Sequence, residues 1–254
     1  MFNENKRGQV ALFVIIALVI VGVLLLIFLF PKSKIGADID ENPTGYLRSC
    51  IEPGIKPEIA RITSQGGFSN PEGFILYNGV KVKYLCYTSE NYKTCVNQAP
   101  MIVGQVENEI SRIIETNTQK CLDQMKTDYQ KRGISVSTGS VKTNTSINTN
   151  GINILIESPI TITKENTQTY RNFEVVIPSE LYTILMASTS IVEFESTYGD
   201  AETTLYLQYY PNLKIRKNLL SDGTTIYNVE DYITNENFTF ASRSVVWPSG
   251  YGIE

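Results

Sequence analysis

Two short clusters of carboxylates contain the residues whose types are best suited to acid–base chemistry. They are Glu193-Phe-Glu195 and Asp200-Ala-Glu202. Two carboxyl groups that flank a glycosidic bond can act as the acid and the base or nucleophile of its hydrolysis. A solvated loop between a helix and a strand explains the same clusters more simply, and we favour this interpretation.

The chain of 254 residues contains no histidine, which is the commonest general base and the commonest metal ligand. It also contains no G-x-S-x-G elbow, phosphate-binding loop, dinucleotide-binding fingerprint or H-E-x-x-H motif. The acidic segment Asp38-Ile-Asp-Glu-Asn42 resembles the opening of a calcium loop, but Pro43 and Ser49 stand where such a loop needs Gly and Glu. We therefore predict that the protein is not an enzyme and has no catalytic, cofactor or metal site.

Four cysteines, Cys50, Cys86, Cys95 and Cys121, allow three disulfide pairings. Cys50 and Cys121 each lie on or beside the apolar stripe of an expected helix, so packing of the two helices would bring them together. Cys86 and Cys95 would then close a short loop. This pairing is the one we favour, and buried free thiols are the main alternative. The spacings contain no close C-x-x-C pair of the kind that zinc sites use.

The charge distribution argues against a nucleic-acid partner. The net charge is −4, and because residues 1–34 carry +3, residues 35–254 carry −7. Binding to phosphate backbones needs clustered Lys and Arg. Tyrosines recur in two groups, at Tyr84 to Tyr92 and at Tyr206 to Tyr210. They suit contact with a surface protein or glycan partner, although half-buried packing is the simpler explanation.

An uncharged apolar run from Val10 to Phe30 predicts a transmembrane helix, because about 20 apolar residues span the hydrocarbon core of a bilayer. A cleaved secretory signal would have a shorter apolar region and a small-x-small cleavage site, and the run has neither. We predict a cytoplasmic tail at 1–9, a helix in the lipid bilayer at 10–30, a flexible stalk at 31–43 and a domain at 44–254, and we consider a sub-boundary near 132.

The side of the membrane on which the domain lies is not set by charge, because basic residues flank both ends of the run. The even number of cysteines favours an oxidising compartment. Two glycosylation acceptors, Asn144-Thr-Ser and Asn237-Phe-Thr, also follow the apolar run. We therefore expect a cell-membrane protein with an extracytoplasmic domain.

Hydrophobic periodicity predicts an α+β fold for this domain, with amphipathic helices and an antiparallel sheet. Helices are expected at 46–62, 102–125 and 181–192, and Pro53 and Pro57 should break or kink the first of them. Asn78-Gly79 predicts a hairpin turn, and Gly66-Gly67 predicts the end of the first helix. Strands are expected at 74–86, 134–147, 152–162, 170–177, 205–209, 213–219, 226–229 and 238–246.

The segment Lys6-Arg7-Gly8-Gln9-Val10 ahead of the apolar helix resembles the processing site of archaeal type IV pilin precursors. The resemblance implies cleavage between Gly8 and Gln9 and self-association of the helix in a filament. Phe13 stands where many pilins have Glu, and Pro31 interrupts the long helix that pilin stacking favours.

A second resemblance rests on five short segments of the outer part. They are Tyr46-Leu-Arg-Ser-Cys50-Ile-Glu, Gln65-Gly-Gly-Phe68, Lys120-Cys121-Leu, Glu157-Ser-Pro-Ile-Thr-Ile162 and Phe238-Thr-Phe-Ala-Ser-Arg243. Through them the outer part is similar to a group of N-terminally anchored surface proteins of small-genome (DPANN) archaea, and the similarity implies no particular activity.

Overall fold

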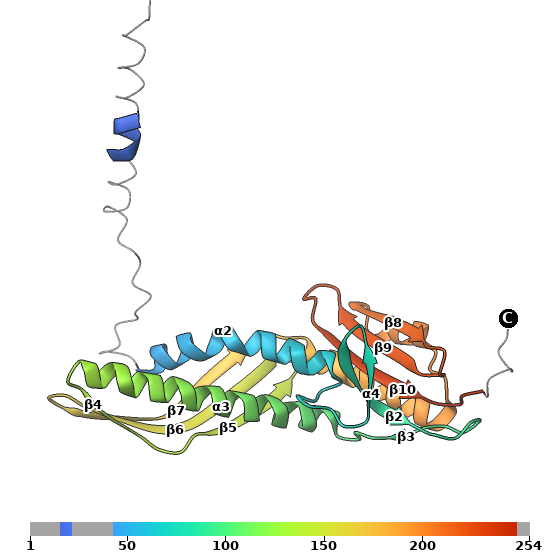
Figure 1. Cartoon of the computed structure of the whole chain (residues 1–254). Helices are drawn as coiled ribbons and strands as arrows, with labels where there is room; N and C mark the ends of the chain where they lie inside the picture. Colours follow the sequence, from blue (N-terminus) through green and yellow to red (C-terminus); the bar gives the residue numbers. More distant parts are fainter. Residues whose placement is uncertain (1–15, 22–42, 248–254) are drawn as a thin grey trace, which may run out of the picture. The chain divides into compact units, whose positions relative to one another are not determined.

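Figure 1 shows the computed structural model of the chain, which describes residues 16–21 and 43–247. The chain divides into two units, residues 1–45 and residues 46–254.

Residues 16–21 are the described part of the membrane helix predicted at 10–30. They are helical, and their large apolar side chains are exposed. Within the described ranges, no helix combines the length and the apolar composition that crossing a membrane requires. The other residues of the predicted anchor, the stalk up to residue 42 and the Gly8–Gln9 site lie outside those ranges, so the anchor and its processing stay predictions.

The first sheet of the larger unit is antiparallel. It contains β4 (Ser135–Thr138), β5 (Lys142–Asn148), β6 (Gly151–Thr163) and β7 (Thr167–Ile177). β6 is the central strand: β7 pairs along one edge, and β5 and β4 follow one another along the other. The buried side chains of β6 include Ile152, Ile154 and Ile156. Helix α3 (Ile102–Lys131) covers this sheet (Figure 1).

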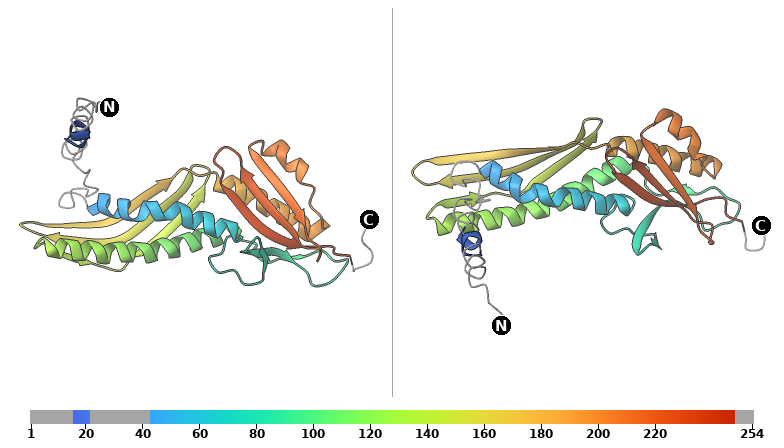
Figure 2. Two further views of the ribbon diagram at one scale, coloured as in Figure 1. Left: turned by 45° about the horizontal axis from the view of Figure 1, so that its top comes forward. Right: turned by 90° about the horizontal axis from the view of Figure 1, so that it is seen from above.

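Helix α2 (Pro43–Ser64) lies beside α3 in all views (Figures 1 and 2). It is continuous over Pro53 and Pro57, so of the predicted break or kink the break does not occur. Both prolines lie on the exposed side, where water can satisfy the carbonyl groups that lose their partners. The opposite side stays buried and holds the helix in place through Leu47, Ile51, Ile55, Ile59 and Ile62.

The predicted helix stop at Gly66-Gly67 is confirmed. Both glycines have positive φ, +73° and +88°, and the N–H of Gly67 donates to the carbonyl of Ile62 at 3.0 Å. A Cβ on Gly67 would lie 2.8 Å from a methyl group of Val106 on α3. Glycine therefore allows both the left-handed turn and the close approach of the two segments.

The second sheet has the order β1-β2-β10-β9-β8, and β3 pairs with β2. Its strands are β1 (Phe74–Tyr77), β2 (Val80–Tyr87), β3 (Val96–Asn97), β8 (Leu213–Leu219), β9 (Thr225–Asp231) and β10 (Asn237–Arg243). Helix α4 (Leu181–Tyr198) packs against β10, β9 and β2 (Figure 2). The predicted hairpin is confirmed, with Asn78 and Gly79 at φ of 49° and 80°.

The α+β class is correct, but the sheet is not purely antiparallel as we predicted. β10 pairs with β2 in parallel, which makes the second sheet mixed. The alternation of apolar residues reports which face of a strand is buried and carries no information on strand direction.

Two predicted strands are also different in the structure. The strand predicted at 134–147 is two strands, because the chain leaves the ladder at Gly139, where a Cβ would lie 2.4 Å from Pro159. The strand predicted at 205–209 is wrong: residues Thr203–Leu205 form the 3-10 helix η1 and Tyr206–Tyr209 form α5. Leu205 and Leu207 are exposed there, so no buried face stabilises an extended conformation.

Candidate functional site

The two disulfides of the structure join Cys50 to Cys121 and Cys86 to Cys95, which is the pairing that we favoured from the sequence. The first links α2 to α3. The second closes residues 86–95, which we name the clamped loop. Structural disulfides persist in oxidising compartments, so their presence is consistent with a domain outside the cytoplasm.

The clamped loop is also held by the C-terminal end of the described chain. The N–H of Tyr92 donates to the carbonyl of Val246 at 3.0 Å, and the N–H of Val245 donates to the carbonyl of Lys93 at 2.8 Å. The Ser244 hydroxyl accepts from the N–H of Cys95 at 3.1 Å and donates to the backbone carbonyl of Glu195 at 2.9 Å. These hydrogen bonds hold the loop against residues 244–246, and through Ser244 against α4.

An exposed aromatic pair joins this loop to the residue that follows Val246. The rings of Tyr92 and Trp247 meet edge to face with centroids 5.1 Å apart, and the two side chains are 51% and 61% exposed. Tyr92 has a φ of 58°, a left-handed conformation that is uncommon for a residue other than Gly, Asn or Asp. Such strain persists only where the surroundings fix it, and it gathers at binding sites.

A second aromatic group lies along β2. Tyr84 and Tyr87 meet edge to face at 5.0 Å, and together with Phe74, Lys83 and Gln98 they line a hollow of about 360 Å³. The Tyr84 hydroxyl hydrogen-bonds the hydroxyl of Thr224 at 2.9 Å, and burial raises the pKa of Tyr84. The first predicted tyrosine group therefore combines half-buried packing at Tyr84 with exposed rings at Tyr87 and Tyr92.

The carboxylate cluster Glu193–Glu195 lies inside α4, so its predicted place in a solvated loop is wrong. The helix continues to Tyr198 and ends before Gly199, whose φ is 93°. Residues two apart on a helix point in different directions, and here Glu193 is exposed whereas Glu195 is only 2% exposed. The two carboxyl groups therefore do not face each other as a glycosidase pair would. Asp200 and Glu202 are exposed after the helix, as predicted, but the segment that holds them leads into η1 and not into a strand.

Glu195 is the centre of a buried polar cluster that the sequence analysis missed. Its carboxylate accepts hydrogen bonds from the Tyr227 hydroxyl, the Ser242 hydroxyl at 3.0 Å and the N–H of Ala201 at 2.9 Å. Burial raises the pKa of Glu195, and the three donors partly oppose this change. Burial and the neighbouring Glu195 charge raise the pKa of Tyr227. A polar residue on the apolar stripe of α4 was the signal that could have revealed it.

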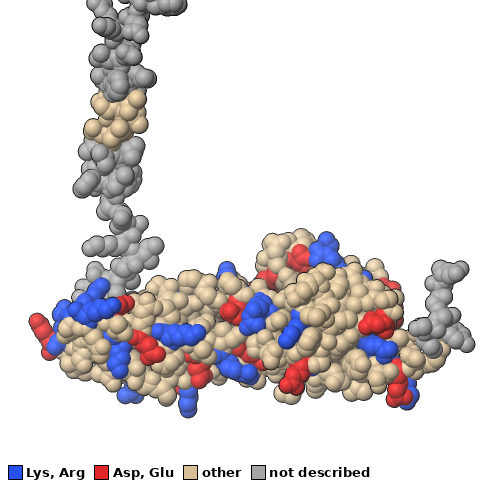
Figure 3. All heavy atoms as spheres, viewed as in Figure 1, with Lys and Arg blue, Asp and Glu red and all other residues tan. Residues whose placement is uncertain are grey.

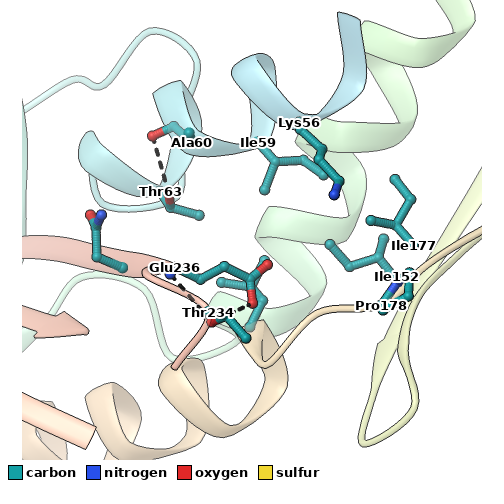
Figure 4. A pocket seen from close by; sticks show the side chains of 11 residues that line it. Lys56, Ile59, Ala60, Thr63, Ile152, Ile177, Pro178, Thr234 and Glu236 are labelled. Carbon is teal, nitrogen blue, oxygen red and sulfur yellow. Dashed lines mark hydrogen bonds between the residues drawn. The ribbon is translucent and has the colours of Figure 1, made fainter. Parts of the chain in front are cut away.

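A cleft of about 370 Å³ lies between α2, the ends of β6 and β7, and the connection from β9 to β10 (Figure 4). Its apolar walls come from several segments that are far apart in the chain. They are formed by Ile59, Ala60, Ile152, Ile177, Pro178 and Leu181. Thr63, Thr234 and Asn237 add polar groups at the cleft.

Two residues of opposite charge line this cleft. The Lys56 side chain extends from α2, and the Glu236 carboxylate enters from the segment before β10 (Figure 4). Glu236 accepts from the Ser179 hydroxyl at 2.7 Å, the N–H of Glu180 at 2.6 Å and the Thr234 hydroxyl at 3.3 Å. Neither charge forms an ion pair within residues 43–247.

The two glycosylation acceptors have different surroundings. Asn144 is exposed on β5, opposite Leu155 of β6. Asn237 is the first residue of β10, is partly buried and lines the cleft. Of the two, Asn144 is therefore the one that presents its amide freely to solvent.

The surface of the domain carries both signs of charge. On the face shown in Figure 3, Lys and Arg side chains are interspersed with Asp and Glu. In the parts of the chain that the structure describes, no three His, Cys, Asp or Glu residues are grouped as a metal ion would require.

Comparison with known proteins adds no relative: no family model, no curated protein and no solved structure matches this chain. Its function has to be argued from its own residues.

Proposed function

We propose that this chain is a membrane-anchored surface protein whose extracytoplasmic domain has a structural or adhesive role and no catalytic activity. The observation that carries the proposal is the exposed aromatic pair formed by Tyr92 on the clamped loop and Trp247 beside it. Aromatic side chains combine a large apolar area with a polar tip and few rotatable bonds, and they dominate the energetics of interfaces. Fixing them before contact lowers the entropy that binding costs.

The proposed anchor is supported by the N-terminal segment. Its residues 16–21 expose Ile16, Leu18, Val19, Ile20 and Val21 by 46% to 66%. Exposed apolar side chains in a row are unfavourable in water, and a lipid bilayer would cover them. The two disulfides fit the proposed location of the domain outside the cytoplasm.

The adhesive role is tested with proteoliposomes that carry the full chain. Their retention is measured on bilayers that display the same protein and on surfaces that display glycans. We expect retention on one of these surfaces, reduced about tenfold by Trp247→Ala and by Tyr92→Ala, because each removes an anchor side chain of the kind worth more than about 1 kcal/mol.

Tyr232→Ala is the matched control, because Tyr232 is 57% exposed, as Tyr92 and Trp247 are to a similar degree, but belongs neither to this pair nor to the two predicted tyrosine groups. It should leave retention unchanged. Retention that is equal in wild type, Tyr92→Ala and Trp247→Ala would contradict the adhesive role.

A pilin-like filament subunit is the second candidate, and Lys6-Arg7-Gly8-Gln9 ahead of the apolar run favours it. The intact mass of the chain extracted from its native membrane without reductant separates the two candidates. A chain that begins at Gln9, recovered from extended polymers, supports the filament. A monomer that begins at or near Met1 supports the uncleaved anchor.

A further inference from the structure

The cleft of Figure 4 has the size of a small-ligand site. Ligand pockets in proteins range from about 300 to 1,000 Å³, and this one measures about 370 Å³. Ile152 and Leu181 are almost fully buried where they line it. The cleft therefore offers apolar walls for a group of a few carbon atoms, whose transfer out of water is favourable.

The charges at the cleft define a second requirement. Lys56 provides an ammonium group on one side and Glu236 provides a carboxylate on the other (Figure 4). The two do not pair with each other or with another charged side chain in residues 43–247. A ligand with a single charge would pair with one of these two residues and would be repelled by the other.

Glu236 is also oriented in advance. The Ser179 hydroxyl and the N–H of Glu180 fix its carboxylate at the segment that leads into α4, and the Thr234 hydroxyl contacts it as well. A carboxylate has about four lone-pair sites, so three donors leave capacity for one more. An ammonium group is a donor that would use it and would also neutralise its charge.

We propose that this cleft binds a small zwitterion with an apolar side chain, of the size of leucine, phenylalanine or a dipeptide. The carboxylate of the ligand pairs with Lys56, its ammonium group pairs with Glu236, and its side chain packs against Ile152, Ile177 and Leu181. The residues that line this site are not those of the Tyr92–Trp247 pair, so the variants that test it differ from those that test the adhesive role.

The test is titration calorimetry of the full chain in lipid nanodiscs with its disulfides intact, because free detergent would itself occupy an apolar cleft. The probes are L-leucine, L-phenylalanine and the dipeptide Leu-Leu. We expect saturable binding of at least one of them with a stoichiometry of one. No binding of any probe to the folded wild type would overturn the proposal.

Analogues of leucine identify what is recognised. Leucinamide keeps the ammonium group without the carboxylate, 4-methylpentanoate keeps the carboxylate without the ammonium group, and glycine keeps both without the side chain. Each should bind about tenfold more weakly than leucine or worse, because each loses either a charge-assisted hydrogen bond or the apolar contact. If 4-methylpentanoate binds as tightly as leucine, the site is one for apolar anions and the proposal is wrong.

Variants locate the site. Lys56→Gln and Glu236→Gln should each weaken leucine binding about tenfold, whereas Lys126→Gln on α3 and Glu174→Gln on β7, both at exposed positions, should not change it. Lys56 is itself exposed on α2, so Lys56→Gln should fold even if Glu236→Gln unsettles the start of α4. Unchanged affinity in a folded Lys56→Gln variant would place the ligand elsewhere and reject this cleft.

Discussion

At the scale of single residues, Glu195 shows how an acidic side chain can be buried without an ion pair to any of residues 43–247. Its three donors come from β9, β10 and the segment after α4. The Ser242 hydroxyl that donates to it also lies 3.7 Å from the sulfur of Cys95, so the cluster extends to the clamped loop. A buried carboxylate is costly unless it is hydrogen-bonded or protonated, which links its protonation to the stability of this region.

Replacing Glu195 by Gln should change how stability depends on pH. The pKa of Glu195 is raised by burial, so the folded state holds its proton more tightly than the unfolded state. The stabilisation that this proton provides is complete below the ordinary glutamate pKa and is lost as pH rises through the raised pKa, by about 1.4 kcal/mol for each pH unit between the two. We expect wild type to have a larger free energy of unfolding than Glu195→Gln at low pH, and we expect this difference, measured in urea titrations, to decrease over that interval. A difference that stays constant with pH would show that the pKa of the carboxyl group does not change on folding.

Glycosylation is a second prediction at this scale. We expect a glycan on Asn144 and none on Asn237, because Asn144 is exposed whereas Asn237 is partly buried and paired with Glu230 in the β10–β9 ladder. Peptide mass spectrometry of the native protein reports both positions directly. Modification of Asn237 alone would be the contrary result.

At the scale of elements, tertiary packing determines whether a segment is helical or extended when its local sequence preferences disagree. The helix α2 contains two prolines, yet its buried stripe and the Cys50–Cys121 bond keep it on α3. Residues 205–209 show the converse, since an alternating sequence without a buried face becomes helical. Alternation of apolar residues and intrinsic propensity predict secondary structure only weakly unless the apolar face packs against another element.

The two disulfides should differ in their effect on stability. Cross-linking removes more entropy from the unfolded chain when the closed loop is longer. Cys50 and Cys121 are 71 residues apart, whereas Cys86 and Cys95 are 9 apart. We expect Cys50→Ser/Cys121→Ser to cost about 4 kcal/mol and Cys86→Ser/Cys95→Ser about 2–3 kcal/mol.

Thermal unfolding of the two double variants measures this difference, and double replacement avoids a lone reactive thiol. The short-loop variant should still lose binding in the proteoliposome assay, because it releases the clamped loop. A larger loss of stability from the short loop than from the long one would contradict the entropic account.

At the scale of the whole molecule, the proposed arrangement is a short apolar anchor followed by a disulfide-bonded binding domain. We expect the full chain to remain in the membrane pellet after extraction at alkaline pH, because about 20 buried apolar residues hold a helix in a bilayer. Replacement of residues 10–30 by a cleavable secretory signal should release the domain into the medium as a disulfide-bonded protein. Release of the unaltered chain by alkali would exclude the anchor.

Most helices, the hairpin at Asn78-Gly79 and the helix end at Gly66-Gly67 could be predicted from the sequence, because helical periodicity and turn chemistry act over a few residues. The cysteine pairing followed once two apolar stripes were assumed to face each other. The absence of histidine is likewise a property of the sequence alone.

The tertiary structure alone decided the parallel pairing of β10 with β2, the burial of Glu195, the strained conformation of Tyr92 and the cleft between Lys56 and Glu236. Each of these joins segments that are far apart in the chain. Contacts between residues that are far apart in the chain determine strand direction, the burial of a charged group and the walls of a cleft. Local sequence patterns do not show which distant residues come into contact. The cleft proposed to bind a ligand belongs to this second class, whereas the sequence by itself indicated Tyr92 only as one of several tyrosines that could contact a partner.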